Sequence, residues 1–487
     1  MSSTRWNGRL YVGGEWRPAS SHQTLASYEK ATQRELGQQA LATDRDLAAA
    51  VSFANGAQRK WAAAAYDVRA AVLRRVARLL EERTSEFADW IVRETGSIRG
   101  KAHHEIHASL HELQEAAALC SAPRAEVLPS RNTGKLSIVE RVPVGLVGII
   151  TPWNFPLLLA LRAVAPAVAL GNAVLLKPAE LTPITGGYLL AELFEDAGLP
   201  AGVLQVLPGL GEEIGDALVR HPDVPMIHFT GSNDVGQRIG SVAGGLLKKI
   251  ALELGGNNAF VVLDDADVDL ASAVGAWSSF HYQGQTCITA GRHIVMRAVA
   301  EPYTAALVAR TRAIAVGDPS SSDKVGLGPM INEVQRDRAL KLVAESVVQG
   351  ATIAEGGTYD GLFVRPTVLT GVTPTMPIYT EEVFGPVAPV VVVDTEAEAL
   401  ALTNGTRYGL TNAVFTGDVM RGLAFAEQVR SGMVHVNDAT CLDEAHVPFG
   451  GTGASGMGGR SGGAANLDEF TERRWIGVQR TPVAYPY

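Results

Sequence analysis

Hydrophobic and polar positions follow two different periods along this chain. Between Ala48 and Cys120, Ala, Leu, Arg and Glu dominate and apolar residues recur every three or four positions, which predicts a helical segment. From Gly145 onward, short apolar runs at 145–150, 173–176 and 203–207 alternate with helices predicted at 157–169 and 185–197. This strand–helix–strand repetition predicts a parallel sheet with crossover helices.

A second α/β series follows the first. Its apolar runs cover residues 258–263, 294–297, 390–393 and 413–415, and a helix is predicted from about Val268. Two more predicted strands, 136–142 and 475–483, have the character of edge strands that a neighbouring subunit would cover. The stretch Gly450–Gly463 is bracketed closely by apolar and charged segments, which predicts a functional or packing loop rather than a linker.

Composition and charge limit the classes of function. The chain has 487 residues, of which 46% are hydrophobic and 19% charged, and its net charge of −9 argues against a nucleic-acid partner. Three scattered cysteines predict reduced thiols in a cytoplasm rather than a disulfide framework. The N-terminus has no apolar signal region, and no uninterrupted apolar run reaches about 18 residues, so neither secretion nor membrane insertion is predicted.

Three residues are candidates for chemistry. Cys287, in the segment Gly-Gln-Thr-Cys, is either a small buried hydrophobe or a nucleophile that a neighbouring base activates. Glu253 stands between two leucines before a Gly-Gly pair, and it is either an exposed strand-end residue or a carboxylate of raised pKa suited to general-base work. Asn154 follows a predicted strand and either closes a turn before Pro156 or donates its amide to a developing oxyanion.

Three further motifs could bind a dinucleotide. Lys177 and Glu180 follow the predicted strand 173–176, and they form either a surface salt pair or a grip on ribose hydroxyls. The segment Phe-Thr-Gly-Ser at 229–232 precedes a helix predicted at about 235–242, whose N-terminus favours a pyrophosphate, although the bare pattern is weak. The segment Glu-Glu-Val-Phe-Gly-Pro at 381–386 is either a plain surface turn or a carboxylate and ring beside a ligand.

Taken together and in this order, the motifs resemble the aldehyde dehydrogenase superfamily over the whole chain. The matching segments are TPWNFP at 151–156, LLKPAE at 175–180, FTGS at 229–232, LELGG at 252–256, GQTC at 284–287 and EEVFGP at 381–386. The resemblance implies an NAD(P)-dependent enzyme that oxidises an aldehyde to a carboxylic acid, with Cys287 as the nucleophile. Asn154 and the Cys287 N–H would form the oxyanion hole, and Glu253 would activate the thiol or the hydrolytic water.

The same resemblance implies a set of cofactor-binding residues. Glu180 favours NAD at the adenosine ribose without excluding NADP. Glu381 would grip the nicotinamide ribose, with Phe384 packed beside it, and Ser232 would contact the pyrophosphate. No metal is expected. The implied cofactor set is Thr151, Trp153, Lys177, Glu180, Gly231, Ser232, Gly236, Leu254, Glu381 and Phe384.

A narrower resemblance indicates the substrate class. LELGGNN at 252–258, GRHIV at 291–295, HVPFGG at 446–451 and GASGMGGRSGG at 453–463 look like the benzaldehyde and vanillin dehydrogenase branch. We therefore expect an aromatic aldehyde, whose ring needs an apolar slot. Residues that would line this slot, or else belong to the ordinary core, are Leu158, Leu161, Ile288 and Phe449.

The chain departs from the family at two positions. Many members carry Trp-Lys where this chain has Arg162-Ala163, and many carry Glu where it has Ser461. In the wider family that Lys and Glu are thought to pass protons between the general base and solvent. We therefore expect Glu253 to release its proton by another route, for example by swinging towards water. An unchanged deacylation rate in a Ser461→Glu, Ala163→Lys variant would show that the absence of the family's Lys and Glu has no effect on deacylation.

Three alternatives stay open at this point. One is an aliphatic or broad-range aldehyde dehydrogenase, and a second is an acylating enzyme that passes the thioester to coenzyme A, against which Glu253 argues. The third is a catalytically inactive binding or structural paralogue, against which the presence of Cys287, Glu253 and Asn154 argues.

The resemblance also implies a three-part α/β fold. A Rossmann-like cofactor-binding domain would comprise residues 1–122 and 144–255, and an α/β catalytic domain residues 256–458. Residues 123–143 and 470–487 would form a small β element for oligomerisation, giving a homodimer or a homotetramer.

Overall fold

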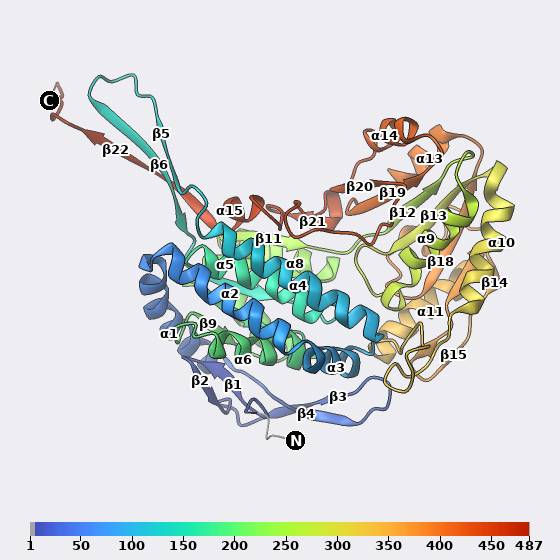
Figure 1. Ribbon diagram of the computed structural model, residues 1–487, viewed down its shortest axis with the longest axis horizontal. Helices are drawn as coiled ribbons and strands as arrows, with labels where there is room; N and C mark the ends of the chain where they lie inside the picture. Colours follow the sequence, from blue (N-terminus) through green and yellow to red (C-terminus); the bar gives the residue numbers. More distant parts are fainter. Residues whose placement is uncertain (1–4, 487) are drawn as a thin grey trace.

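The computed structural model describes residues 5–486, which fold into two α/β bodies and a projecting arm (Figure 1). The first body is built on an eight-stranded sheet of order β2-β1-β9-β8-β7-β10-β11-β21, of which the five strands from β9 to β11 are parallel. Its strands are β1 (Leu10–Val12), β2 (Glu15–Arg17), β7 (Leu146–Ile150), β8 (Ala173–Lys177), β9 (Leu204–Val206), β10 (Met226–Thr230), β11 (Lys249–Glu253) and β21 (Gly456–Met457).

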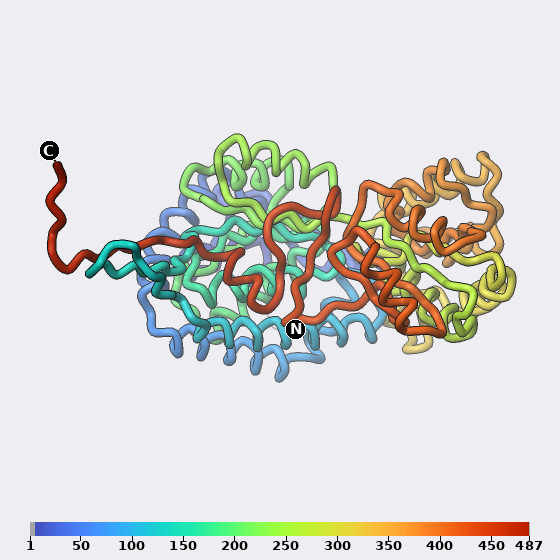
Figure 2. Tube along the Cα trace, turned by 90° about the horizontal axis from the view of Figure 1, so that it is seen from above, coloured from blue at the N-terminus to red at the C-terminus, as the bar shows by residue number. Residues whose placement is uncertain are grey.

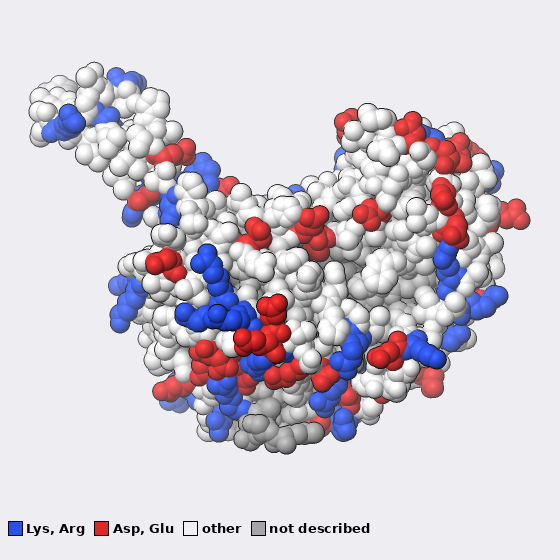
Figure 3. Space-filling model, viewed as in Figure 1, with Lys and Arg blue, Asp and Glu red and all other residues white. Residues whose placement is uncertain are grey.

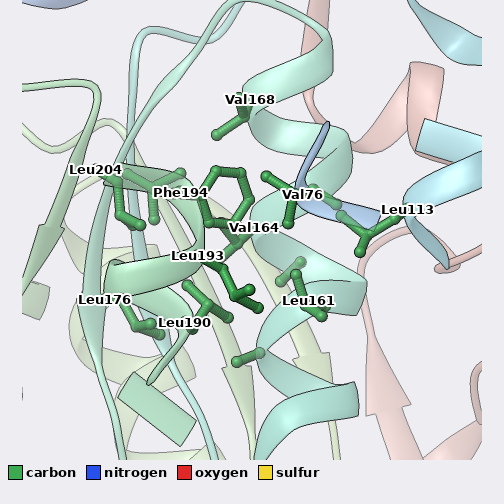
Figure 4. Close-up of a cluster of buried hydrophobic side chains, with 14 of the residues drawn as sticks. Val76, Leu113, Leu161, Val164, Val168, Leu176, Leu190, Leu193, Phe194 and Leu204 are labelled. Atoms are coloured by element: carbon green, nitrogen blue, oxygen red, sulfur yellow. The ribbon is translucent and has the colours of Figure 1, made fainter. Parts of the chain in front are cut away.

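Helices cover both faces of this sheet. Along β7, Val147 and Ile149 pack under α2 to α6, whereas Leu146 and Ile150 pack against α1, α7 and α8, because successive side chains of a strand point to opposite faces. The first of these two cores is drawn in part in Figure 4. The helices are α1 (Asp44–Ala63), α2 (Tyr66–Glu82), α3 (Thr84–Thr95), α4 (Arg99–Leu119), α5 (Pro156–Ala169), α6 (Leu189–Asp196), α7 (Asp216–Arg220) and α8 (Asn233–Gly245), with π-helical turns η1 (Ile184–Tyr188) and η2 (Gly211–Gly215).

The second body is built on a seven-stranded sheet of order β14-β17-β18-β13-β12-β19-β20, parallel except at β14. Its strands are β12 (Asn258–Val262), β13 (Ala290–Met296), β14 (Thr352–Glu355), β17 (Thr367–Thr370), β18 (Val387–Val393), β19 (Thr411–Phe415) and β20 (Met433–Val436). The helices that follow in the chain are α9 (Val268–Phe280), α10 (Arg297–Ala313), α11 (Glu333–Val348), α12 (Pro377–Thr380), α13 (Glu396–Thr403), α14 (Val419–Ala426) and α15 (Ala465–Glu469), with the 3₁₀ turns η3 (His281–Gly284) and η4 (Gly453–Ser455). Two small hairpins complete the fold, β3 (Thr24–Tyr28) with β4 (Glu35–Ala40) and β15 (Tyr359–Asp360) with β16 (Phe363–Val364).

A three-stranded arm projects from the first body and carries the C-terminus (Figures 1 and 2). Strand β6 (Lys135–Pro143) pairs with β5 (Ala125–Leu128) on one side and with β22 (Thr471–Gln479) on the other. Val127 and Trp475 are 65% and 64% exposed, and clusters of charged side chains, most of them basic, also lie on the arm in the space-filling view (Figure 3). The arm therefore offers exposed apolar side chains among charged ones, together with free strand edges.

The sequence pattern predicted this architecture well. The α/β class, both parallel series and the two strands outside them are confirmed, with ends that shift by a few residues. The glycine-rich stretch is a packed segment, because β21 within it pairs with β11. The predicted domain bounds and the oligomerisation role of the arm stay predictions. Between residues 5 and 486, no helix is both long enough and apolar enough to span a membrane.

Candidate active site

A pocket opens where the strand order of the first sheet reverses direction. Strand β7 has β8 on one side and β10 on the other, so the segments that leave the carboxyl ends of β7 and β10 diverge and create a crevice. Cys287, Asn154 and Glu253 all line this pocket, although they are far apart in sequence. The structure thus brings the three candidate catalytic residues together.

Cys287 lies on a tightly wound segment between η3 and β13. Tyr282, Gln283 and Gly284 all have positive φ, and a Cβ on Gly284 would lie 2.1 Å from the Gly385 carbonyl oxygen. Only glycine fits there, which explains the glycine of the motif. The Gln283 side chain anchors the turn by donating to the carbonyls of Gly96 and Pro329. This backbone holds the Cys287 thiol at the floor of the pocket.

The surroundings of Cys287 shift the pKa of its thiol. Burial raises the pKa of the thiol well above its ordinary value, the charge of Glu382 raises it further, and Arg162 opposes both. The side-chain amide of Asn258 donates to the Cys287 carbonyl at 2.9 Å and fixes the loop. Among the described residues, no backbone acceptor takes the Cys287 N–H, which leaves that donor for another oxygen.

Asn154 is 3% exposed and reaches the nucleophile loop from the end of β7. Its Nδ2 donates to the Gln285 carbonyl at 3.0 Å, and its backbone carbonyl accepts a 2.8 Å bond from the buried Lys101. Lys101 also pairs with Glu105, whose other oxygen accepts from the Leu157 N–H at the start of α5. Sequence patterns did not single out this clamp, since its parts come from two distant helices.

Glu253 ends β11 and is 7% exposed, with its Oε2 lacking any hydrogen-bond partner. Burial raises its pKa to about 8, against the opposing charges of Arg460 and Arg162. The carboxyl group is therefore a weak acid that shares a pocket with a thiol, which is the arrangement that general-base catalysis needs.

Five of the ten dinucleotide candidates line the same pocket as Cys287. Trp153, Gly231, Ser232, Leu254 and Phe384 line the pocket, and the Trp153 and Phe384 rings meet edge to face at 5.4 Å.

Lys177 and Glu180 form a pair at the end of β8. The Lys177 ammonium donates to Glu180 Oε2 at 3.0 Å, and the Gly211 N–H donates to Oε1 at 3.0 Å. Thr151, after β7, is buried and its N–H donates to the Lys177 carbonyl. Gly236 serves packing, since a Cβ there would lie 2.3 Å from Leu254.

In the segment 381–386, the structure places Glu382 in the pocket rather than Glu381. Glu381 is extended and its carboxylate pairs with Arg407 at 3.0 Å, whereas Glu382 lines the pocket and accepts from the Gly256 N–H at 3.0 Å. Neighbouring residues of an extended segment point to opposite sides, so the two carboxylates diverge. Burial raises the pKa of Glu382 to about 7. The lining of the pocket therefore favours Glu382 for the ribose role expected of Glu381, and that role itself stays a prediction.

A second, mainly apolar cavity reaches Cys287 from the other side. Leu158, Ile288 and Phe449 line it as predicted, but Leu161 does not. Leu161 is fully buried in the core between α5 and α6, where Figure 4 shows it. The cavity side of α5 carries Leu158, Leu159 and Arg162, and at about 100° per residue Leu161 points roughly 100° away from the middle of that arc. The wall also includes residues that the sequence pattern missed, namely His104, Phe155, Leu159, Arg162, His281, Cys441 and Asp443.

Arg162 occupies a central position in this cavity wall. It donates to Glu112 at 2.8 Å, also pairs with Asp443, and lies over the Phe449 ring at 4.7 Å. The two carboxylates balance the buried cation, as a charge in such a site requires. Arg162 thus joins α4, α5 and the segment before Phe449 into one wall.

The mouth of the apolar cavity is polar. His104, Arg162 and Asp443 also border a larger, open depression whose other lining residues include His107, His111 and His446. Within residues 5–486, no three His, Cys, Asp or Glu side chains are arranged as metal ligands. The depression is therefore an approach to the cavity without a metal cluster.

This chain is similar to known proteins over nearly all of its length. A model of the aldehyde dehydrogenase family matches residues 16–476. The chain is 48% identical to a vanillin dehydrogenase of an Amycolatopsis species, over 100% of this chain and 99% of the relative. It is 48% identical to an NAD⁺ benzaldehyde dehydrogenase of Pseudomonas putida, over 93% and 92%. Betaine aldehyde dehydrogenase of Staphylococcus aureus, solved in complex with NAD⁺, is similar with a TM-score of 0.96 and 31% identity over 99% and 97%.

Proposed function

Because this chain belongs to the aldehyde dehydrogenase family, we propose that it oxidises an aromatic aldehyde to the carboxylic acid with NAD, through a thioester on Cys287. The protein is an oxidoreductase of that family, and aldehyde oxidation is its reaction class. The observation that carries the finer proposal is the meeting of Cys287, Asn154 and Glu253 in one pocket that dinucleotide candidates also line and that adjoins an apolar cavity.

The first half-reaction uses Cys287 and Asn154. The Cys287 thiol first gives its proton to solvent water in the open pocket, and the thiolate then attacks the aldehyde carbon and forms a tetrahedral thiohemiacetal. The free Cys287 N–H and the Asn154 amide are placed to receive its oxyanion once Nδ2 leaves the Gln285 carbonyl, which contributes about 3–4 kcal/mol per donor. A dinucleotide held by the residues of the pocket would supply the hydride acceptor for this oxidation, and Cys287 is left as a thioester.

The second half-reaction uses Glu253. Its carboxylate takes a proton from a water molecule, the resulting hydroxyl attacks the thioester carbon, and the carbon–sulfur bond breaks to release thiolate. Because Glu253 can act as this base, we expect water, and not coenzyme A, to take the acyl group from Cys287. Cysteine suits both halves, because it attacks as thiolate and leaves as thiolate.

The dinucleotide candidates suit NAD chemically. The N-terminus of α8, with Ser232 and Gly231, is a site for a pyrophosphate, and Glu180 and Glu382 are acceptors for the two riboses. A carboxylate at Glu180 accepts from a 2′-hydroxyl and repels a 2′-phosphate, so NAD is preferred over NADP.

Replacing Glu382 by Ala is expected to lower kcat/KM for NAD by about tenfold or more, through a higher KM for NAD, a lower kcat, or both. The reason is that a hydrogen bond to a charged group is worth about 1.5–3 kcal/mol. Steady-state kinetics with varied NAD measure the effect. Glu381→Ala is the matched control, because Glu381 faces Arg407, and a larger defect in this variant would contradict the assignment.

An aromatic substrate fits the cavity beyond Cys287. The side chains of Leu158, Ile288 and Phe449 offer flat apolar contact for a ring, while His104 and Asp443 at the mouth can bond a polar ring substituent. The vanillin and benzaldehyde dehydrogenases among the relatives support the same class.

The experiment that tests this function is a kcat/KM panel of aromatic and aliphatic aldehydes with NAD and NADP, with and without coenzyme A. We expect the highest values for benzaldehydes with NAD and no dependence on coenzyme A. Faster turnover of aliphatic aldehydes would contradict the substrate class, and a requirement for coenzyme A would contradict hydrolysis. Absence of NADH with every aldehyde would favour an inactive paralogue.

The arm supports a proposal about assembly. Its exposed Trp475 and the free edges of β5 and β22 would be covered in a homodimer or homotetramer. We retain residues 123–143 and 470–487 as the oligomerisation element, 1–122 and 144–255 as the cofactor-binding domain, and 256–458 as the catalytic domain. Sedimentation measurements on the full chain and on a chain ending at residue 470 test the assembly.

A further inference from the structure

Glu253 lies in a site where two family side chains are replaced by smaller ones. Ala163 is fully buried in the core of the first body, and Ser461 is 2% exposed and pairs through its backbone with Phe449. Neither residue carries an ionisable side chain that could exchange a proton with Glu253. The carboxyl oxygen Oε2 is buried without a partner, so a proton on it needs another acceptor.

A small enclosed cavity behind Cys287 contains another proton acceptor, His228. Glu253, Arg162, Ser461 and His228 all line it. His228 lies in the middle of β10, 2% exposed, and neither of its ring nitrogens has a hydrogen-bond partner in the described part of the chain. Leaving both nitrogens of a buried imidazole unpaired is costly, which indicates that water in the cavity completes their bonding.

Strand register aligns His228 with Glu253. Thr230 pairs with Glu253, His228 with Ala251, and Met226 with Lys249, and alternate residues of these two strands share one face. The rows of Glu253 and His228 are therefore about 7 Å apart, at about 3.3 Å per residue. Ala251 beside His228 is small and leaves space between the carboxyl group and the ring. A water molecule in the cavity that both side chains line would bridge the carboxyl group and the ring.

A second buried carboxyl group lies beyond His228. The His228 ring stacks on Phe470 at 6.0 Å, and the preceding residue, Glu469, ends α15. The Oε1 atom of Glu469 is buried without a partner. The negative charge of Glu469 raises the pKa of Glu253, so the two carboxyl groups interact electrostatically. Burial raises the pKa of Glu469, and the charge of Lys249, which is partly exposed at the start of β11, opposes this shift. Glu469 is thus coupled electrostatically both to Glu253 and to Lys249 near the surface.

Burial, assisted by the charge of Arg162, favours a neutral His228 ring. Arg162 from α5 and Arg460 from the glycine-rich segment face Glu253, Glu469 comes from α15, and Lys249 lies at the outer end. Burial lowers the pKa of His228 to about 4, with help from Arg162. A neutral imidazole has one accepting and one donating nitrogen, so it can take a proton on one side and release one on the other.

We propose that His228 and Glu469 carry the proton of Glu253 to solvent beside Lys249, in place of the family's Lys and Glu. The proposal rests on the proposed function. Glu253 takes one proton from the attacking water, a cavity water passes it to the accepting nitrogen of His228, and the other nitrogen gives its proton to Glu469. Glu469 releases that proton to bulk water, and the ring returns to its first tautomer. No oxidation state changes along this path. His228 and Glu469 both act through Glu253 and are positioning residues for its proton.

The experiment compares His228→Gln and Glu469→Gln with the wild-type enzyme. Rapid mixing with benzaldehyde and NAD gives the first-turnover rate of NADH formation, and intact mass after acid quench gives the acylated fraction. We expect the first-turnover rate to stay within about twofold, while the acylated fraction rises and deacylation slows by about 10²-fold, the usual scale of proton-transfer catalysis. The double variant should be no slower than the slower single variant, since both serve one path.

Two controls separate a proton path from a structural role. Glu472→Gln on the exposed side of β22 and His221→Gln after α7 remove similar groups outside the cavity and should leave both rates unchanged. Added imidazole should restore deacylation in His228→Ala in proportion to its neutral form. Should His228 variants fail to fold, Glu469→Gln with the same two readouts decides the matter.

Three outcomes have different meanings. Unchanged deacylation in both variants, or an equal loss in both half-reactions without rescue by imidazole, overturns the proton path while leaving the proposed function intact. Absence of NADH in the wild-type enzyme overturns the proposed function and the path with it. Slow deacylation with rescue supports the path.

Discussion

Replacement of Cys287 by Ala is expected to lower kcat by at least about 10⁴-fold with every aldehyde, since removing a nucleophile removes the covalent route altogether. NAD should still bind, because the helix N-terminus of α8 and the two ribose carboxylates are unaffected. NADH absorbance and cofactor titration by fluorescence measure the two effects.

The chain contains a suitable control for this experiment. Cys120 is a second buried thiol, and its sulfur contacts the carbonyls of Ala116 and Ala169 in the core, far from the pocket lining. Cys120→Ala should therefore keep the wild-type turnover number at a temperature where it is folded. Cys441 is unsuitable, because it lines the substrate cavity. Residual turnover in Cys287→Ala near the wild-type value would refute the thioester mechanism.

Glu253→Gln is expected to lower kcat by about 10²–10⁴-fold while sparing the first turnover. The amide cannot take a proton from water, so the enzyme should form one NADH per site and then remain acylated. Rapid mixing and the mass of the acid-quenched protein detect this state. Equal loss of the first turnover would instead place Glu253 in thiol activation.

The pH profile of deacylation follows from the same residue. The folded pKa of Glu253 is about 8, so at pH 7 only about a tenth of the molecules carry the carboxylate that acts as base. Deacylation should accordingly rise as pH increases through about 8 and then level off. The raised pKa also means that the folded state holds a proton that the unfolded state releases above its ordinary pKa of about 4.5. This group therefore makes a contribution to stability that decreases as pH rises from about 4.5 to 8.

The positions of the catalytic trio illustrate what linear sequence can convey. Cys287, Glu253 and Asn154 each stand in a short segment whose residues are dictated locally, such as the glycine that the turn at Gly284 requires. These segments were recognisable in order along the chain. Their own surroundings in sequence did not decide between a catalytic and a structural role, because each role depends on groups from other elements. Glu253 has the raised pKa that suits the proposed base only because the fold buries it.

Side-chain direction is where the sequence prediction was least accurate. Glu381 and Glu382 are adjacent and identical in type, and only the extended backbone after α12 turns one to Arg407 and the other to the pocket. On α5, an apolar run gives no sign of which leucine faces the cavity, and Leu161 packs in the core instead. Such choices are set by the rotation of an element against its neighbours.

The sequence by itself determined the parallel α/β architecture, because hydrophobic period and length are local properties of each strand and helix. It also determined the catalytic segments and the absence of the family's Lys and Glu at positions 163 and 461. Only the tertiary structure decided which carboxylate lines the pocket beside Cys287 and that His228 lies on the same sheet face as Glu253 and lines one cavity with it. These facts depend on strand order, register and burial, which arise from contacts between residues that are distant in the chain.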